Sequence, residues 1–311
     1  MSEMYRSSAL EPAGPSRRFE ALRALFGTLR HDRFALVSLL FLTAVLILSI
    51  IGPSWLGDEA RAMNLRARNA PPFSVESGWL FLLGADALGR SLLARIVVAT
   101  QNTILIAVFA VVLSLLIGSV LGLIAGFKDG WVGVVLLRFA DAVMSFPTML
   151  LAVIVLYILN PGIQNVILVL AISRLPIYIR TVRAQVLEIK QRLFVQAAIA
   201  TGASTARILF RHVAPMVIPT VLNLAALEMA FVMLVESGLS FLGIGIQSPE
   251  ITWGLMVADG RNYLGSAWWL SFWPGLAIML VALSLNLLAN WLRIAVDPAE
   301  RWRLETGAGE E

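Results

Sequence analysis

Side chains that can carry out acid–base or metal chemistry are scarce in this chain. Its 311 residues include two histidines, His31 and His212, and no cysteine. The two lysines, Lys128 and Lys190, lie outside any GxxxxGK[ST] phosphate loop, so the chain lacks that route to binding and hydrolysing ATP. An enzyme would need a nucleophile with its base, or a set of metal ligands. We therefore predict no catalytic residue, no metal site and no cofactor bound by this chain.

Three ionisable residues lie instead within long apolar runs. Arg174 falls in the run 163–182, and Glu228 and Glu236 fall in the run 216–242. A charge inside a membrane is costly and normally faces a partner or a water-filled cavity. For Arg174, a pore-facing position and a buried ion pair both remain open. Each glutamate is either a functional group or a hydrogen-bonded structural residue, and all three residues are candidates for a pore or gate.

The composition points to a membrane protein. Hydrophobic residues make up 59% of the chain, charged residues only 14%, and the mean hydropathy is +0.82. These values exclude an ordinary soluble domain and predict an all-α, multi-span fold. The basic residues gather near the ends of apolar runs, which favours contact with membrane lipid over binding of nucleic acid.

Apolar runs long enough to cross a bilayer predict six transmembrane helices with both termini in the cytoplasm. The predicted spans are 34–52, 102–127, 132–159, 163–182, 216–242 and 274–292. In the third run, Arg138 and Asp141 are three residues apart and are expected to pair. Pro147 should kink that span because it removes one backbone hydrogen bond.

The same pattern divides the chain into four parts. Residues 1–33 are expected to form a cytoplasmic tail with an amphipathic helix, and 34–101 the first span with an external loop. Residues 102–296 are expected to form a core of five spans, followed by a cytoplasmic tail at 297–311. Within the last external segment, 255–263 is expected to form a short surface or re-entrant helix.

Small residues recur every fourth position in the second run, at Ser114, Gly118, Gly122 and Gly126. They lie along one stripe of the predicted helix, where another helix can approach closely. Packing within one chain is the favoured interpretation, and a subunit interface is the alternative.

Between residues 180 and 215 the apolar chain becomes polar. The segment carries six basic residues: Arg180, Arg183, Lys190, Arg192, Arg207 and Arg211. A basic segment between two spans is expected in the cytoplasm. Its pattern predicts a helix–turn–helix: one helix over 185–200, an interruption at Gly202, and a second short helix from Ala203 that ends at Pro215. The residues alone favour a solvated connector.

Within this segment, QAAIATGASTARILFRHVAPMVIP resembles the EAA loop of ABC importer permeases. Gln196, Ala197 and Ala198 occupy the positions of the Glu-Ala-Ala triplet, Gly202 that of its glycine, and Pro215 that of its proline. Gln196 departs from the pattern because it lacks the charge of the family's glutamate.

Other stretches resemble the dipeptide, oligopeptide and nickel importer permeases, and most of all their C-type subunit. LGADALGRSLLAR at 83–95 is similar to their LGTDxxGRDxLSR stretch, with Ala85 for Thr and Ser91 for Asp. ESGLSFLGIGIQSPEITWG at 236–254 and LNLLANWLRIAVDP at 285–298 are similar as well, so the resemblance covers about residues 34 to 298.

The resemblance implies a type I, MetI-like permease in the bacterial inner membrane. A homologous second permease would complete the pore, two ABC ATPase subunits would use ATP and Mg²⁺, and an extracytoplasmic binding protein would deliver substrate. It implies that the ATPase-coupling residues are Gln196, Ala197, Ala198, Gly202, Ala203, Arg211 and Pro215. Di- or oligopeptides are the expected substrate, with nickel chelates, glutathione or opines as alternatives.

A stand-alone secondary transporter is the competing class of function. Such proteins commonly contain inverted repeats and broken helices, and the sequence contains no convincing internal repeat.

Overall fold

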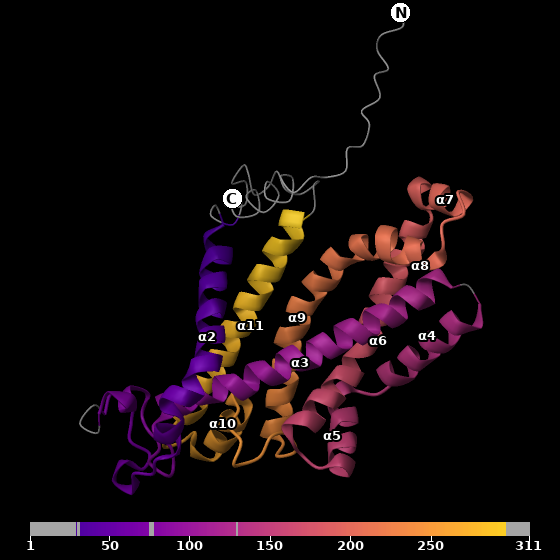
Figure 1. The fold of residues 1–311 in the computed structure, drawn as a ribbon. Coiled ribbons are helices and arrows are strands. Elements are labelled where there is room, and N and C mark those ends of the chain that lie inside the picture. The colour runs from indigo at the N-terminus through magenta and orange to yellow at the C-terminus, as the bar shows by residue number, and fades with distance from the viewer. Residues whose placement is uncertain (1–28, 30–31, 75–77, 129, 297–311) are drawn as a thin grey trace, which may run out of the picture.

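The computed structural model describes residues 29, 32–74, 78–128 and 130–296. These residues form an all-α fold in which five helices are long and apolar enough to cross a membrane, or six spans if one bent pair counts as a single span. Figure 1 shows their arrangement. The long helices are α2 (Arg33–Arg61), α3 (Leu92–Phe127), α6 (Ile163–Lys190), α9 (Ala214–Phe241) and α11 (Trp269–Val296).

The bent pair corresponds to the third predicted span. Helices α4 (Trp131–Met144) and α5 (Thr148–Leu159) meet at an angle of 88°. Pro147 stands at the N-cap of α5, because proline fits the start of a helix and disfavours helical backbone in the residue before it. The predicted position of the bend is therefore confirmed, but the run is two helices rather than one kinked span.

Several predicted span boundaries were wrong because helices continue beyond the apolar runs. Helix α2 continues past residue 52 to Arg61, and α3 begins at Leu92 rather than at 102. At its start, the Ser91 hydroxyl accepts a hydrogen bond from the Ala94 amide at 3.2 Å, as a helix N-cap does. The loop between these two spans is therefore confined to residues 62–91.

The glycine stripe of α3 packs against α6 of the same chain. A methyl group added at Gly118 would lie 2.6 Å from Tyr178 Cβ, and one added at Gly122 would lie 2.7 Å from Val182 Cβ. Gly126 meets α6 in the same way, and Ser114 in the same stripe is completely buried. The stripe therefore lies against a helix of the same chain.

Hydrophobic packing extends from α6 into the polar segment between α6 and α9. A buried cluster joins Tyr178 and Val186 of α6 to Val195 of helix α7 (Leu193–Ala200) and Ile208 of helix α8 (Thr205–Ile208). These two short helices are therefore anchored to the helices that flank them.

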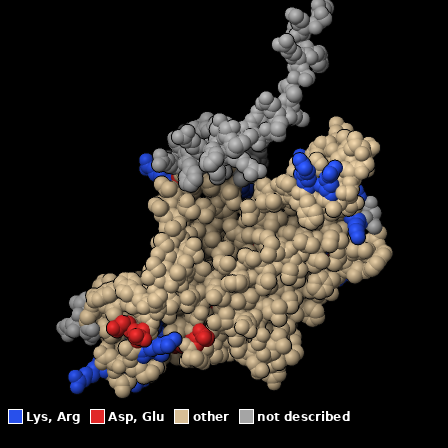
Figure 2. Space-filling view, in the orientation of Figure 1, with Lys and Arg blue, Asp and Glu red and all other residues tan. Residues whose placement is uncertain are grey.

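The helices place two regions with charged side chains at opposite ends of the molecule. Helices α7 and α8 lie at one end, and α10 (Trp253–Gly260) lies at the other with the loop 62–91 (Figure 1). Figure 2 shows basic side chains at the α7 end and mixed acidic and basic side chains at the α10 end, with an uncharged band between them on this face.

The short helix predicted over 255–263 is confirmed by α10 and the 3₁₀ turn Arg261–Tyr263 that follows it. The start of α2 and the end of α11 lie at the same end of the molecule as α7 (Figure 1). The predicted amphipathic helix within 1–33 and the tail 297–311 fall outside the described residues, apart from residues 29, 32 and 33.

Candidate functional site

The polar segment between α6 and α9 forms a helix–turn–helix, as predicted, with different boundaries. Helix α6 continues to Lys190, and α7 ends at Ala200. After α8, one π-helical stretch (Leu209–Val213) leads directly into α9. The prediction that the second helix ends at Pro215 was therefore wrong. That proline lies in the first turn of α9, and residues Thr205–Phe241 form one helical segment.

Gly202 ends α7 through a specific backbone motif. Its φ of +77° is in the left-handed region, which glycine adopts without strain. The Gly202 amide donates to the Ile199 carbonyl at 3.0 Å, and the Ala203 amide donates to the Ala198 carbonyl at 3.0 Å. These two bonds are those of a Schellman cap. The sharp turn between α7 and α8 thus explains why the EAA-like segment has a glycine at this position.

Gln196 holds α7 against the end of α6. Its Nε2 donates to the Lys190 carbonyl at 2.8 Å. A glutamate at this position would have no hydrogen to donate when ionised. Of the other residues predicted to couple to an ATPase, Ala197, Gly202, Arg211 and Pro215 are exposed, and Ala198 and Ala203 are half-buried. The exposed Leu193 begins the same helix.

Most basic side chains of the segment bind within the chain. Arg183 Nε and Lys190 Nζ each donate at 3.3 Å to a carbonyl in the last turn of α3, those of Ala125 and Phe127. Cations near a helix C-terminus are favoured by the helix dipole. Arg192 pairs with Glu188 at 2.9 Å.

Arg180 of the same segment pairs with Asp141 of α4. The predicted pair of Arg138 with Asp141 is present at 3.8 Å, although Arg180 is the closer partner. The side chains of Arg207 and Arg211 make no hydrogen bond or ion pair to another described residue, and both residues are exposed. These two cations are therefore available to a partner at the α7 end.

Arg174 and Glu228 form an ion pair inside the helix bundle. The Arg174 guanidinium donates through both Nε and Nη2 to the two carboxylate oxygens, with Nη2 at 2.7 Å from Oε1. Their side chains are 15% and 6% exposed, and the guanidinium carbon lies 4.1 Å from the centre of the Phe231 ring. The pair ties α6 to α9. Arg174 also lines a small cavity of about 120 Å³ beside the α4–α5 bend.

Glu236 has a structural position near the other end of α9. The side chain is almost completely buried, and its Oε1 accepts from the Ser240 and Thr252 hydroxyls, each at 2.9 Å. Thr252 also caps α10, because its hydroxyl accepts from the Leu255 amide at 3.1 Å. Glu236 therefore connects α9 to the start of α10.

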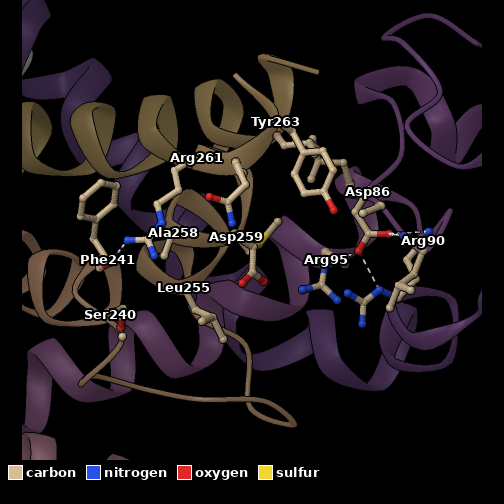
Figure 3. Close-up of a pocket in the computed structure, with 18 of the residues that line it drawn as sticks. Asp86, Arg90, Arg95, Ser240, Phe241, Leu255, Ala258, Asp259, Arg261 and Tyr263 are labelled. Atoms are coloured by element: carbon tan, nitrogen blue, oxygen red, sulfur yellow. Dashed lines mark hydrogen bonds and ion pairs between the residues drawn. The ribbon is translucent and has the colours of Figure 1, made fainter. Parts of the chain in front are cut away.

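A charged cavity at the α10 end was missed by the sequence reasoning. It has a volume of about 450 Å³ and lies between the loop 62–91, the first turn of α3, the end of α9 and α10 (Figure 3). The LGADALGRSLLAR stretch supplies Asp86, Arg90 and Arg95. That stretch was interpreted only as a family signature, although three charged residues within ten positions were visible in it.

Asp86 organises this side of the cavity. Its Oδ1 accepts from the amides of Leu88 and Arg90, each at 2.9 Å. Its Oδ2 pairs with Arg90 Nε at 2.7 Å and with Arg95 Nε at 3.5 Å. Gly89 makes the turn possible, because its φ is +72° and a Cβ there would collide with the Asn64 carbonyl.

Helix α10 and the following turn supply the opposite wall. Loss of hydration raises the pKa of Asp259, while the nearby Arg95 and Arg90 act to lower it. Arg261 donates to the Phe241 carbonyl at 2.8 Å and lies over the Phe241 ring, so it caps the C-terminus of α9. Among the described residues, no cluster of three or more His, Cys, Asp or Glu could hold a metal ion.

Known proteins similar to this chain share one function class. The family described as "Binding-protein-dependent transport system inner membrane component" matches residues 118–302. A di/tripeptide transport system permease protein, DppC, from Pseudomonas aeruginosa is 36% identical over 96% of this chain and 98% of its own. The nickel transport system permease protein NikC of Escherichia coli is 34% identical over 84% of this chain and 93% of its own.

A solved structure has a similar fold. The MetNI methionine ABC transporter, described in inward facing conformations, matches with a TM-score of 0.52 and 18% identity. The match covers 64% of this chain and 95% of that chain. Together, the described helices and these similarities show that the chain belongs to the family of binding-protein-dependent transport system inner membrane components, as a multi-pass, non-catalytic permease subunit of the ABC transporter type.

Proposed function

We propose that this chain is a pore-forming subunit of an ATP-driven importer of di- or oligopeptides in the bacterial inner membrane. A homologous permease would form the second half of the pore, and two ABC ATPase subunits would bind ATP and Mg²⁺. An extracytoplasmic binding protein would deliver the substrate. Peptide transport is supported by the similarity over nearly the whole chain to the di/tripeptide permease of Pseudomonas aeruginosa.

The observation that carries this proposal is the way α7 is attached. Its exposed residues, including Leu193 and Ala197, are open to solvent, while Val195 anchors it to the core. It is tied to α6 by Gln196 and leads through Gly202 into the helical segment that contains α9. A partner that moves α7 would therefore move α6 and α9, and a rigid two-state element of this kind is what coupling requires.

The distribution of basic residues indicates how the chain is oriented in the membrane. Arg207 and Arg211 place free cations at the α7 end, and basic loops remain on the cytoplasmic side. We assign this end, with both chain termini, to the cytoplasm. The α10 end is then extracytoplasmic, and exposed apolar residues along the outer helices, such as Leu40 and Ile50 of α2 and Leu116 of α3, face membrane lipid.

The domain division retains four parts. Residues 1–33 and 297–311 would be cytoplasmic tails, and 34–91 would contain the first span with its external loop. The permease core would begin with α3 at Leu92 rather than at the predicted 102, and would extend to 296. Within that core, the α6–α9 connection at 185–215 is the coupling loop. Coupling is assigned to Gln196, Ala197, Ala198, Gly202, Ala203, Arg211 and Pro215.

The test uses two substitutions at Gly202. Asparagine tolerates the left-handed backbone of a helix C′ position, whereas a β-branched residue is strained there. No atom lies within 4 Å of an added Cβ at this position, so backbone conformation alone separates the two variants. Gly202→Val is expected to abolish peptide uptake while membrane levels persist, and Gly202→Asn is expected to retain most uptake.

The measurement is uptake of a labelled dipeptide together with ATP hydrolysis by the reconstituted transporter. Gly202→Val should hydrolyse ATP without the stimulation that substrate-loaded binding protein gives the parent transporter. Normal uptake in Gly202→Val would overturn the coupling assignment. Uptake by the chain alone in liposomes under an ion gradient would favour a secondary transporter instead.

Nickel-chelate import is the second candidate for the substrate, supported by the similarity to the nickel permease NikC. Glutathione and opines are further candidates. The ligand that co-purifies with the cognate binding protein decides among them, because recognition in such a system belongs mainly to that protein.

A further inference from the structure

The charged cavity at the α10 end contains two opposite charges that do not pair with each other. Arg95 is only 5% exposed, and the one ion pair that it makes to a described residue is with Asp86 at 3.5 Å. Asp259 is exposed, and its carboxylate makes no hydrogen bond or ion pair to another described residue. Both residues line the cavity, and Figure 3 shows their side chains directed into the same space.

The remaining charges of the cavity are already occupied. Asp86 binds Arg90 and two backbone amides, and Arg261 caps the end of α9. Arg95 therefore offers guanidinium N–H groups to a ligand in the cavity. Asp259 offers its carboxylate where the cavity opens to solvent. A ligand in this space meets one basic group and one acidic group.

A ligand with both charges fits this arrangement better than a simple ion. A small anion could bind the planar fork of Arg95 but would leave Asp259 unpaired and would be repelled by it. A small cation would face the converse problem at Arg95. A zwitterion can pair with both side chains, because it carries a carboxylate for Arg95 and an ammonium for Asp259 in one molecule.

The size and the remaining walls agree with a short peptide. The volume of about 450 Å³ lies within the range of about 300–1,000 Å³ of small-molecule sites. Apolar side chains line part of the space, among them Leu92, Leu255, Met256 and Leu270. They offer contacts to side chains of many shapes and little to distinguish them.

We propose that this cavity is a low-affinity receiving site for a dipeptide with free termini, with Arg95 binding the C-terminal carboxylate and Asp259 the N-terminal ammonium. The inference rests on peptide import as the proposed function, and places its first permease contact on the extracytoplasmic side. Residues Asp86 and Arg90 act as positioning residues, because they hold the start of α3 and Arg95 in place.

The test measures binding directly, without transport. The transporter, assembled from this chain with its partner permease and ATPases, is placed in nanodiscs without the binding protein. Saturation-transfer NMR then compares alanyl-alanine with its N-acetylated and its C-amidated forms. We expect each blocked peptide to bind about fivefold more weakly than the free dipeptide, the factor for the loss of one partly exposed ion pair.

Variants identify the site. Asp259→Asn should lower binding of the free dipeptide about fivefold and remove its advantage over the N-acetylated form, while the preference for a free carboxylate persists. Asp259→Glu should restore much of the advantage. Asp58→Asn makes the same charge change on an exposed residue of α2 outside the cavity and should change nothing.

Several results would overturn the site. These are equal binding of free and N-acetylated dipeptide by the parent transporter, an unchanged preference in Asp259→Asn, and equally strong binding of acetate or methylamine alone. Dipeptide import with binding protein present is measured separately. If the transporter imports dipeptides but does not prefer free over blocked peptides in binding, only the proposed receiving site is wrong. If it imports no peptide at all, the proposed function is wrong.

Discussion

At the scale of single residues, two of the three ionisable groups inside the bundle pair with each other, and the third is hydrogen-bonded to hydroxyl groups. Arg174 binds Glu228 across the α6–α9 interface, and Glu236 accepts two hydroxyl hydrogen bonds. An unpaired charge at this depth would be expensive, so a pair of opposite sign is the arrangement that burial requires. The sequence left Arg174 open between a pore-facing group and a buried pair. Its partner lies 54 positions away, and no local pattern identifies such a partner.

Removing one partner of this ion pair should destabilise the protein more than replacing both partners with apolar residues. Arg174→Met or Glu228→Leu alone leaves a buried charge without a partner, at a cost of about 3–5 kcal/mol. The double variant removes both charges and should recover much of the loss. Thermal unfolding of the purified transporter measures the three variants.

Arg138→Met provides the matched control for this series. Its side chain is 81% exposed and lies 3.8 Å from Asp141, and such pairs contribute about 0–1 kcal/mol. If the double variant were less stable than either single variant, the ion pair would not be the source of the effect. A changed import profile for acidic peptides in Arg174→Ala would indicate that this residue also faces the pore.

At the scale of elements, the contact between α3 and α6 depends on residues without side chains. A Cβ at Gly122 would lie 2.8 Å from the Ile179 carbonyl as well as 2.7 Å from Val182 Cβ. A backbone carbonyl cannot rotate away as a side chain can. The two helices would have to separate, and that separation would spread along the stripe to Gly118 and Gly126.

Gly122→Ala should therefore destabilise the transporter by about 1–3 kcal/mol, the usual range for overpacking. The matched control is Gly57→Ala in α2, where no atom lies within 4 Å of the added methyl group. That change should be neutral or slightly stabilising, because alanine is the better helix former. Thermal unfolding compares them, and equal stability of the two variants would contradict the packing argument.

At the scale of the whole molecule, the two ends differ in what they present to solvent. One carries α7, with the exposed Arg207 and Arg211 nearby, and the other carries the cavity between α3 and α10. If the ends lie on opposite sides of a membrane, a reagent that cannot cross it should reach only one. The absence of cysteine from the chain makes this measurable without background.

Gln247→Cys and Arg207→Cys place single thiols on exposed residues at the two ends. We expect a membrane-impermeant maleimide to label Gln247→Cys in intact spheroplasts. Arg207→Cys should be labelled only after the membrane is opened. Labelling of Arg207→Cys in intact spheroplasts would reverse the proposed orientation.

The sequence predicted the helical class, most spans and the helix–turn–helix between α6 and α9, because apolar run length and glycine position carry that information locally. It predicted the α4–α5 bend from Pro147 but not its 88° angle, since neighbouring helices determine the angle. It missed the cavity because Arg95 and Asp259 come from stretches 164 positions apart in the chain, and only the packing of α3 against α10 brings them together.

One continuous helical segment, Thr205–Phe241, extends from the turn after α7 to the wall of the cavity, where Phe241 contributes to the lining. Two binding events at the ends of one segment are subject to thermodynamic reciprocity. A dipeptide that favours one position of α9 must change the affinity of α7 for an ATPase by the same factor by which the bound ATPase changes the affinity for the dipeptide. Dipeptide binding in the cavity on one side of the membrane would thus change ATPase binding at α7 on the other side through this helical segment alone.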